Sequence, residues 1–193
     1  MIKKNIIIIP ARGGSKRLKN KNILKICGIP MFLMVAKEAE KSHYFNDVYV
    51  SSEDKKILNI CKKNNIKFII RPIALSQDST EKQDVIVHAI KKLSRKIKID
   101  DVVSLQPNSP EFRSKHLDEA YIFFKNKLYP NSKIKELITI NKTDKIQNAA
   151  FRIMTLKTVF QKTLSTKIGV YLRNYIDIHD RVDYMKVKKK IEK

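Results

Sequence analysis

The sequence predicts an α/β protein built on an open, mostly parallel, doubly wound sheet. Short apolar segments of strand length alternate with amphipathic segments of helical length through about 140 residues. In addition, a cluster of polar residues directly follows each of several predicted strands. Parallel strands connected by helices produce this alternation, and their carboxyl ends form the usual ligand crevice of such sheets.

The first strand and its loop form the segment around which the rest of the chain is organised. Ile6–Ile9 read as a strand buried on both faces, and Pro10 ends it because proline lacks a ladder donor. The loop that follows carries two glycines, a serine and several cations: Gly13, Gly14, Ser15, Lys16, Arg17, Lys19 and Lys21. Glycine lets backbone amides approach a ligand closely, and amides with cations suit a polyphosphate. The loop matches neither of the standard nucleotide-binding motifs, GxGxxG and GxxxxGK[ST]. A solvated basic loop therefore remains the alternative.

The next elements follow from apolar spacing and from proline. After a connector at 23–29, Pro30 can open a helix over 31–42, since its missing donor is harmless in a first turn. The inward side chains of that helix are Phe32, Leu33, Val35, Ala36 and Ala39. We expect a strand at 47–51, a helix at 53–64 with Ile57, Leu58, Ile60 and Cys61 inward, and a strand at 68–70.

A third helix has Asp78 or Ser79 as its expected N-cap, with Glu81 and Asp84 near its start. Its buried stripe consists of Val85, Ile86, Ala89, Ile90 and Leu93. A strand at 101–105 and a helix at 114–126 follow, the latter with Leu117, Ala120, Tyr121, Phe123 and Phe124 on its core side. Later strands are expected at 137–140 and 149–154, and the chain closes with an extended segment at 175–178 and a basic helix.

Polar clusters at 12–22, 51–54, 71–72 and 106–113 each lie just after a predicted strand. One crevice at the carboxyl edge of the sheet could collect all four. The 51–54 cluster has an equally weighted alternative, because its side chains could simply cap the next helix. Among the histidines, we expect His88 to be packed and His43 and His116 to lie on the surface.

Composition fits one folded domain over 1–193, since 42% of the residues are hydrophobic and 31% are charged. The formal net charge of +22 is compatible with an anionic small substrate. The lysines spread along the entire length without a recognition motif, so we do not expect nucleic acid as the main partner. No apolar run reaches the ~20 residues of a membrane span, and we expect no membrane partner or signal peptide. Two isolated cysteines favour a reducing, cytoplasmic location.

Several motifs occur together in order: IIPARGGSKR, Lys21-Asn22, VSSED at 50–54, RPIALSQDS at 71–79, DVIVHAI and LQPNSPEFR at 105–113. With this set the chain resembles the acylneuraminate cytidylyltransferases, the CMP-sialic acid synthetase family, over residues 5 to about 126. The resemblance implies a Rossmann-like nucleotidyltransferase fold of the nucleotide-diphospho-sugar transferase type. It also implies that CTP and a nine-carbon 2-keto sugar acid (N-acylneuraminate, legionaminate or pseudaminate) give a CMP-sugar and pyrophosphate with Mg²⁺.

The resemblance also implies roles for individual residues. Arg12, Lys16 and Lys21 match triphosphate-handling cations, with Gly13, Gly14 and Ser15 in the same loop. Asn22 and Arg71 match positions near the nucleoside, and Arg71 can donate to the cytosine carbonyl. Gln106, Asn108 and Ser109 match the loop that meets the sugar acid. Asp177 matches a metal ligand, with His179 as the second expected ligand of that site, and the catalytic set is Arg12, Lys21 and Asp177.

Departures from the family pattern define a second hypothesis. The Asp-x-Asp metal pair becomes Asp177-Ile178-His179, and imidazole suits Mg²⁺ poorly. The family's Asn-Gly-Ala segment is Asn148-Ala149-Ala150, and Glu81 stands near where the family often has a small hydroxyl residue by the base. The segment between Ile140 and Asn148 is too short for the arm that pairs two family subunits, so a homodimer would lack its usual contact. The alternative is therefore a degenerate homologue that binds a nucleotide or anionic sugar without turnover.

Overall fold

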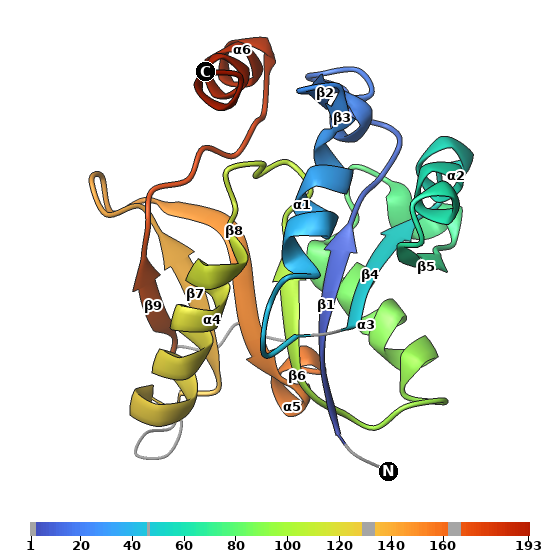
Figure 1. Cartoon of the computed structure of the whole chain (residues 1–193). Helices are drawn as coiled ribbons and strands as arrows, with labels where there is room; N and C mark the ends of the chain where they lie inside the picture. The colour runs from blue at the N-terminus through green and yellow to red at the C-terminus, as the bar shows by residue number, and fades with distance from the viewer. Residues whose placement is uncertain (1–2, 46, 129–133, 162–166) are drawn as a thin grey trace.

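A seven-stranded sheet in the order β5-β4-β1-β6-β8-β7-β9 forms the centre of the molecule (Figure 1). The computed structural model describes residues 3–45, 47–128, 134–161 and 167–193. The strands are β1 (Lys4–Pro10), β4 (Asp47–Ser52), β5 (Lys67–Ile70), β6 (Ile99–Leu105), β7 (Glu136–Ile140), β8 (Gln147–Thr155) and β9 (Gly169–Leu172). A separate small hairpin consists of β2 (Lys25–Ile26) and β3 (Ile29–Pro30), where the sequence indicated only a connector.

The sheet is mostly parallel, as predicted. β1 pairs in parallel with β4 and β6, β4 with β5, and β7 with β9, while β8 runs antiparallel to both of its neighbours. The carboxyl ends of β1, β4, β5 and β6 therefore meet at one edge of the sheet, the upper edge in Figure 1. Strand β9, which joins the sheet at its outer edge, was not predicted.

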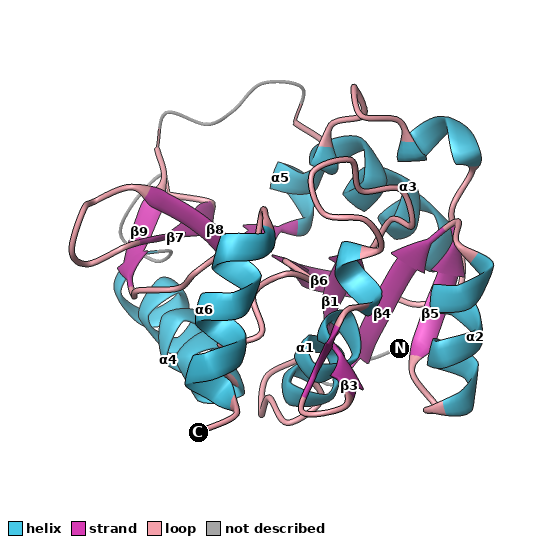
Figure 2. Ribbon diagram, turned by 90° about the horizontal axis from the view of Figure 1, so that it is seen from above, coloured by secondary structure: helices cyan, strands magenta, loops and turns pink. Residues whose placement is uncertain are grey.

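Helices lie on both faces of the sheet, as the view from above shows (Figure 2). The α-helices are α1 (Met31–Ala39), α2 (Lys55–Lys63), α3 (Lys82–Leu93), α4 (Ser114–Phe123), α5 (Leu156–Val159) and α6 (Arg181–Ile191). Short 3₁₀-helices occur at η1 (Lys21–Ile23) and η2 (Ile73–Ser76), and a short π-helix occurs at η3 (Phe124–Leu128). Every helix predicted from apolar spacing is present, with its ends shifted by a few residues.

The isoleucine run of β1 explains why both faces are covered. Ile7 and Ile9 pack with buried residues of α1, α2 and α4, whereas Ile6 and Ile8 pack with those of α3 and α5. All four isoleucines are fully buried. Burying each such side chain contributes about 1.5–3 kcal/mol, so the alternation of the strand fixes β1 at the centre of the sheet.

A smaller apolar cluster attaches α6 to the loop after β1. Its members come from distant parts of the chain: Leu18, Ile26, Met31, Ile178, Tyr184 and Val187. The Tyr184 hydroxyl also donates to the Lys25 carbonyl oxygen at 2.6 Å. The C-terminal segment is thereby held above the carboxyl edge of the sheet, close to the glycine-containing loop.

Three sequence predictions about individual side chains are wrong. Helix α3 begins at Lys82 with Glu81 as its N-cap residue, so neither Asp78 nor Ser79 caps it. Phe123 is 38% exposed, because the buried stripe of α4 runs through Leu117, Ala120, Tyr121 and Phe124, and Phe123 lies beside that stripe. His116 is buried, and its Nδ1 shares a hydrogen bond of 2.9 Å with the Tyr175 hydroxyl.

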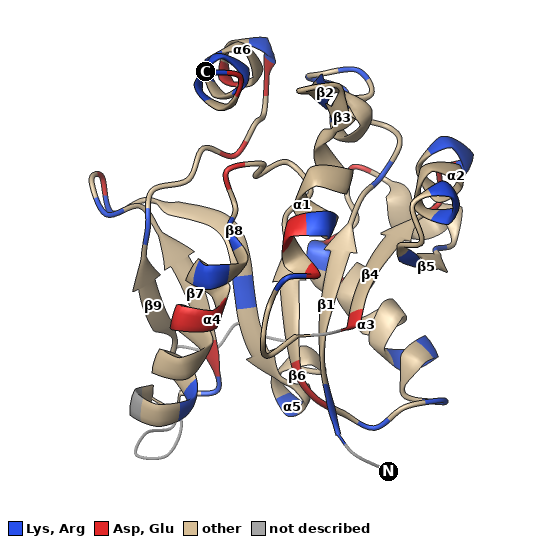
Figure 3. Cartoon of the chain, in the orientation of Figure 1, with Lys and Arg blue, Asp and Glu red and all other residues tan. Residues whose placement is uncertain are grey.

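The remaining features of the fold are the distribution of positive charge and the connection between β7 and β8. Lysine and arginine occur on several helices, strands and loops in Figure 3 rather than gathered on one element. The connection between β7 and β8 is a turn over residues 141–146, in which the Asn141 amide donates to the Ile146 carbonyl oxygen. Within the described residues, no helix combines the length and the apolar composition needed to cross a membrane.

Candidate functional site

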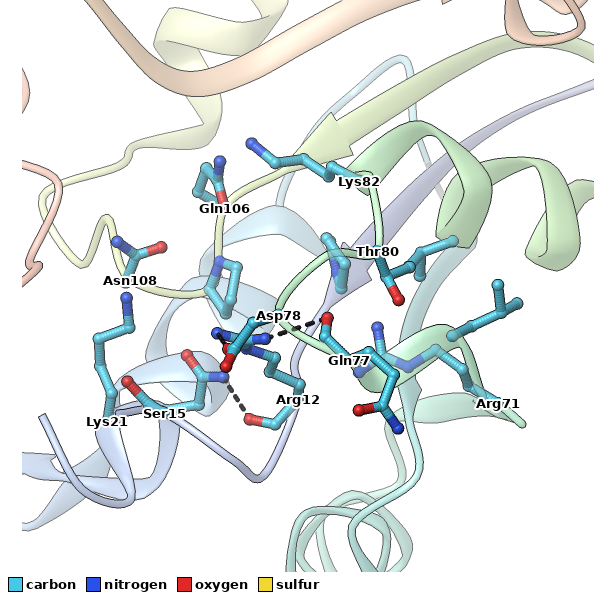
Figure 4. A pocket seen from close by; sticks show the side chains of 15 residues that line it. Arg12, Ser15, Lys21, Arg71, Gln77, Asp78, Thr80, Lys82, Gln106 and Asn108 are labelled. Atoms are coloured by element: carbon cyan, nitrogen blue, oxygen red, sulfur yellow. Dashed lines mark hydrogen bonds and ion pairs between the residues drawn. The ribbon is translucent and has the colours of Figure 1, made fainter. Parts of the chain in front are cut away.

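A cavity of about 320 Å³, called here the main cavity, lies at the carboxyl edge of the sheet. Its lining comes from the ends of β1 and β6 and from the segments after β5: Pro10, Arg12, Ser15, Lys21, Asn22, Arg71, Leu75, Gln77, Asp78, Thr80, Lys82, Val85, Gln106, Pro107 and Asn108 (Figure 4). Seven of the residues predicted for the site line it: Arg12, Ser15, Lys21, Asn22, Arg71, Gln106 and Asn108. Three of the four predicted clusters, at 12–22, 71–72 and 106–113, contribute to this lining, whereas no residue of the 51–54 cluster does.

Arg12 occupies the middle of the main cavity. Its Nη2 lies 2.8 Å from Asp78 Oδ1, and its Nη1 donates to the Gln77 carbonyl oxygen at 3.3 Å. The Lys16 ammonium reaches the other Asp78 oxygen at 2.6 Å. Figure 4 shows the Asp78 carboxylate beside the Arg12 guanidinium, between the Lys21 and Arg71 ends of the cavity. One carboxylate thus pairs with two of the three cations that were predicted to hold phosphate, Arg12 and Lys16.

Glu53 connects the first loop to Arg71. Glu53 Oε1 accepts the Gly13 amide at 2.8 Å, and Oε2 accepts Arg71 Nη2 at 2.6 Å and Nε at 3.2 Å. Burial alone would raise the pKa of Glu53, but the hydrogen bonds from Arg71 and Gly13 hold that pKa below its usual value. Arg71 is itself buried, so this contact fixes its direction. Glu53 was missed as a positioning residue, although the 51–54 cluster that contains it was noted.

Gly13 is required by close packing. A Cβ at this position would lie 2.1 Å from Asp54 Oδ2, and Asp54 cannot move freely because it caps α2 through the Lys56 and Ile57 amides. Because Glu53 accepts the Gly13 amide, that amide is not available to a phosphate in this structure. A Cβ added at Gly14 would meet no atom within 4 Å, so packing does not require glycine at this position.

Asn22 is buried, and its side-chain amide donates to the Arg12 carbonyl oxygen at 2.8 Å. This contact spans the loop and holds the backbone of Arg12 in place. The Asn22 Oδ1 atom is buried and has no hydrogen-bond partner among the described residues. A buried acceptor without a partner is costly, so a donor supplied by a ligand would stabilise it.

The loop after β6 holds the C-terminal segment in place through hydrogen bonds. The Asn108 side-chain amide donates to the Ile178 carbonyl oxygen at 3.0 Å, and the Ile178 amide donates to the Asn108 carbonyl oxygen at the same distance. The Ser109 hydroxyl donates to Asp177 Oδ1. Asn108 and Ser109, predicted to contact substrate, therefore hold Asp177 close to the main cavity.

Lys21, Lys82 and Asp177 form an electrostatic group. Burial raises the pKa of Asp177 above its ordinary 3.8, against the Ser109 hydrogen bond and nearby positive charges. Desolvation lowers the pKa of Lys21 and of Lys82, and in both cases the Asp177 charge opposes that shift. Lys82 is exposed as a whole residue, yet its ammonium is desolvated at the cavity wall. Lys82 was not predicted, because nothing in a single helical lysine distinguishes it from a surface charge.

His179 lies in an adjoining depression, the outer hollow, lined by Arg12, Ser15, Lys16, Arg17, Lys21, Asp78 and His179. Among the residues that the structure describes, no group of three or more histidine, cysteine, aspartate or glutamate side chains is arranged to hold a metal. Mg²⁺ is often bound by one or two carboxylates together with substrate phosphates and water. Asp177, a desolvated carboxylate beside the phosphate-type cations, fits that pattern, whereas the imidazole of His179 does not.

The solved structures share this fold. CMP:2-keto-3-deoxy-manno-octonic acid synthetase complexed with CTP superposes with a TM-score of 0.78 at 16% identity, covering 98% of each chain. A cytidylyltransferase from Leptospira borgpetersenii superposes with a TM-score of 0.73 at 19% identity, covering 98% of this chain and 87% of that one. These similarities confirm the Rossmann-like nucleotidyltransferase fold that was predicted.

Curated relatives are more similar in sequence. Pseudaminic acid cytidylyltransferase of Campylobacter jejuni is 36% identical over 120 residues, which are 61% of this chain and 52% of that protein. N-acylneuraminate cytidylyltransferase of Escherichia coli is 35% identical over 117 residues, 61% of this chain and 27% of that protein. The chain thus spans at most about half the length of these relatives. The family model described as Cytidylyltransferase matches residues 6–188, and the chain therefore belongs to the cytidylyltransferase family.

Proposed function

We propose that the protein transfers the cytidylyl group of CTP to a sialic-acid-like 2-keto sugar acid, such as an N-acylneuraminate, legionaminate or pseudaminate, and releases pyrophosphate. The observation that carries the proposal is the convergence of Arg12, Lys21, Arg71 and Gln106 on one cavity. The names of the curated relatives, cytidylyltransferases for N-acylneuraminate and pseudaminic acid, support the substrate class.

In this proposal the nucleotide lies along the main cavity. The Arg71 guanidinium is oriented by Glu53, and one of its remaining N–H groups can donate to the cytosine carbonyl. Arg12, Lys16 and Lys21 bind the triphosphate, with Ser15 and Asn22 lining the same wall. Asp78 must give up its contacts with Arg12 and Lys16 when the phosphates bind, since one guanidinium cannot serve both anions fully.

The acceptor approaches from the side of Gln106 and Asn108. Its anomeric hydroxyl attacks the α-phosphorus and releases its proton to water, the bond from that phosphorus to the bridging oxygen of the β-phosphate breaks, and pyrophosphate leaves. Such a step needs alignment and charge neutralisation rather than a covalent protein nucleophile. Arg12 and Lys21 neutralise the negative charge that develops on the phosphates, and Ser109 keeps Asp177 directed toward this end of the cavity.

Cytidylyltransferases of this family generally use a divalent metal ion. We propose that Mg²⁺ is the ion here and that Asp177 is its protein ligand. The ion, when bound, supplies positive charge to the phosphate oxygens. Asp177 contributes a hard oxygen donor, whereas His179 at the edge of the outer hollow adds little to its affinity.

A second candidate is a protein that binds the nucleotide or an anionic sugar without turnover. The observation that favours it is His179, because within the described part of the chain Asp177 belongs to no group of three or more histidine, cysteine, aspartate or glutamate side chains that could hold a metal. The two candidates differ in one measurement, the release of pyrophosphate from CTP.

The test is a panel of sialic, legionaminic, pseudaminic and Kdo acids with CTP and excess Mg²⁺, assayed for pyrophosphate. Release with one of the first three supports transfer to a sialic-acid-like acceptor. CTP binding by calorimetry without release from any acid supports the second candidate, and a protein that neither binds CTP nor releases pyrophosphate contradicts both.

A further inference from the structure

A second cavity, called here the side cavity, adjoins the main cavity at Lys82. Its volume is about 230 Å³. It is lined by residues of α3, β6 and β8 and by Glu81, which directly precedes α3; the full lining is Glu81, Lys82, Gln83, Ile86, Ser104, Gln147, Ala149, Phe151 and Arg152. Lys82 lines both cavities, so its side chain forms part of the wall that they share.

The other cation of the side cavity is already engaged. Arg152 Nε donates to Glu136 Oε2 at 2.6 Å, Nη2 forms an ion pair with the same oxygen, and Nη1 donates to Gln83 Oε1 at 3.0 Å. Glu136 is fully buried, and Gln83 donates onward to the Val159 carbonyl oxygen at 2.6 Å. The Arg152 side chain is therefore held in place as part of the cavity wall, and Glu136 neutralises its charge.

Lys82 is different. Its ammonium has no hydrogen bond or ion pair with any residue that the structure describes, and Figure 4 shows the side chain extending toward Gln106. Desolvation lowers the pKa of Lys82, and Asp177 acts on it from a distance without a direct contact. A cation on the wall of two cavities and without a partner among the described residues can form charge-assisted hydrogen bonds with an anion that reaches it.

We propose that Lys82 binds the carboxylate of the acceptor while the body of the acceptor occupies the side cavity. This inference rests on the proposed function. In the ring form of a 2-keto sugar acid, the carboxylate and the reacting hydroxyl are attached to the same carbon atom. The cation that receives the carboxylate must therefore lie beside the α-phosphorus, at the junction of the nucleotide space and the acceptor space. Lys82 occupies that junction.

The rest of the side cavity suits a hydroxylated, acylated ring. Ile86, Ala149 and Phe151 supply apolar surface, while Ser104 and Gln147 can form hydrogen bonds with hydroxyl or amide groups. Glu81 is the acidic member of the lining and is exposed to solvent.

The experiment compares Lys82→Gln and Lys82→Arg with a matched control, Lys91→Gln, an exposed lysine on the same helix. Steady-state kinetics give separate KM values for CTP and for the best acid of the panel. We expect Lys82→Gln to raise the acceptor KM roughly ten- to hundredfold, because a charge-assisted hydrogen bond is lost. The CTP KM should change less than about twofold, and Lys82→Arg should restore part of the acceptor affinity. A loss confined to kcat, or equal rises in both KM values, would instead assign Lys82 to the phosphates and overturn the proposal.

A binding measurement separates this inference from the proposed function. Calorimetry in the presence of a non-hydrolysable CTP analogue measures the affinity of the acid and of its carboxamide without any turnover. We expect the unchanged protein to prefer the acid by tenfold or more and Lys82→Gln to show no preference. If the unchanged protein binds the acid but releases no pyrophosphate, the proposed transfer fails while the Lys82 inference stands. If acid and carboxamide bind equally, or neither binds, the Lys82 inference fails.

Discussion

The Asp78 carboxylate lies 2.8 Å from the Arg12 guanidinium. In this structure it therefore pairs with the positive charge to which the proposed triphosphate would bind. Lys16 contacts the same carboxylate at 2.6 Å, and this contact with that of Arg12 lowers the pKa of Asp78 below its usual value. The proposed binding of CTP is therefore an exchange of one anion for another, and the affinity for CTP depends on how readily Asp78 gives way.

We predict that Asp78→Asn strengthens CTP binding roughly two- to fivefold, since exposed ion pairs are individually weak. Calorimetry of CTP binding checks this, with Asp100→Asn as the control, because Asp100 pairs with Lys3 away from the cavity. Weaker binding by Asp78→Asn would mean that Asp78 orients Arg12 rather than competing for it.

Lys21→Ala should lower kcat/KM for CTP at least tenfold, because a partly buried cation on the cavity wall is lost. Lys189→Ala is the matched control, since Lys189 is an exposed lysine of α6. Lys190 is unsuitable for this purpose, because it forms an ion pair with Glu111. Equal losses in the two variants would contradict the assignment of Lys21 to the site.

Glu53→Ala should both destabilise the fold and weaken CTP binding, because it leaves the buried Arg71 guanidinium without its counter-charge. Breaking a buried pair costs roughly 3–5 kcal/mol of unfolding free energy, measurable by urea denaturation. The pKa of Glu53 is lowered in the folded state, so its contribution is present above about pH 4.5 and is lost as the pH falls through the folded value. The difference from the unchanged protein should therefore shrink in acid.

For the Glu53 test, the control is Glu40→Ala, which removes an exposed carboxylate paired with Lys37. A surface pair of this kind contributes about 0–1 kcal/mol. If the two glutamate variants unfold at the same urea concentration, Glu53 does not hold Arg71 in the way described.

Asp177→Asn should abolish metal-dependent turnover and yet leave the protein at least as stable. Burial raises the pKa of Asp177 in the folded state, so its ionised form opposes folding once the pH exceeds that raised value. The asparagine can still accept the Ser109 hydroxyl. We expect a stability gain on the order of 1 kcal/mol at pH 7 and almost none at pH 3, by urea denaturation. A loss of stability at pH 7 would show that the carboxylate is needed for the fold.

His179→Asp should raise Mg²⁺-dependent pyrophosphate release if Asp177 holds the ion, since it adds a second hard oxygen ligand at the edge of the outer hollow. A titration of activity against Mg²⁺ should show half-saturation at a lower concentration. His43→Asp, a change at an exposed histidine, serves as the control. An unchanged Mg²⁺ dependence would argue against a metal at Asp177.

Local patterns in the sequence were enough to determine the scaffold. The fully apolar Ile6–Ile9 run requires cover on both faces of its strand, and the alternation of short apolar strands with amphipathic helices leaves a doubly wound sheet as the natural solution. Because parallel strands end at one edge, the clusters containing Arg12, Arg71 and Gln106 had to meet, and their place in the chain was sufficient to predict it.

What only the tertiary structure decided are the pairings between those clusters and the burial of single side chains. Glu53 was one of four candidates for a helix cap until its contacts with Gly13 and Arg71 were known, and Asp78 looked like a cap until Arg12 lay beside it. Lys82 resembles any helical lysine in the sequence, and its significance comes from two cavities that meet at its side chain. Periodicity reports which face of an element is buried, but the partner of a charge depends on residues brought together from distant parts of the chain.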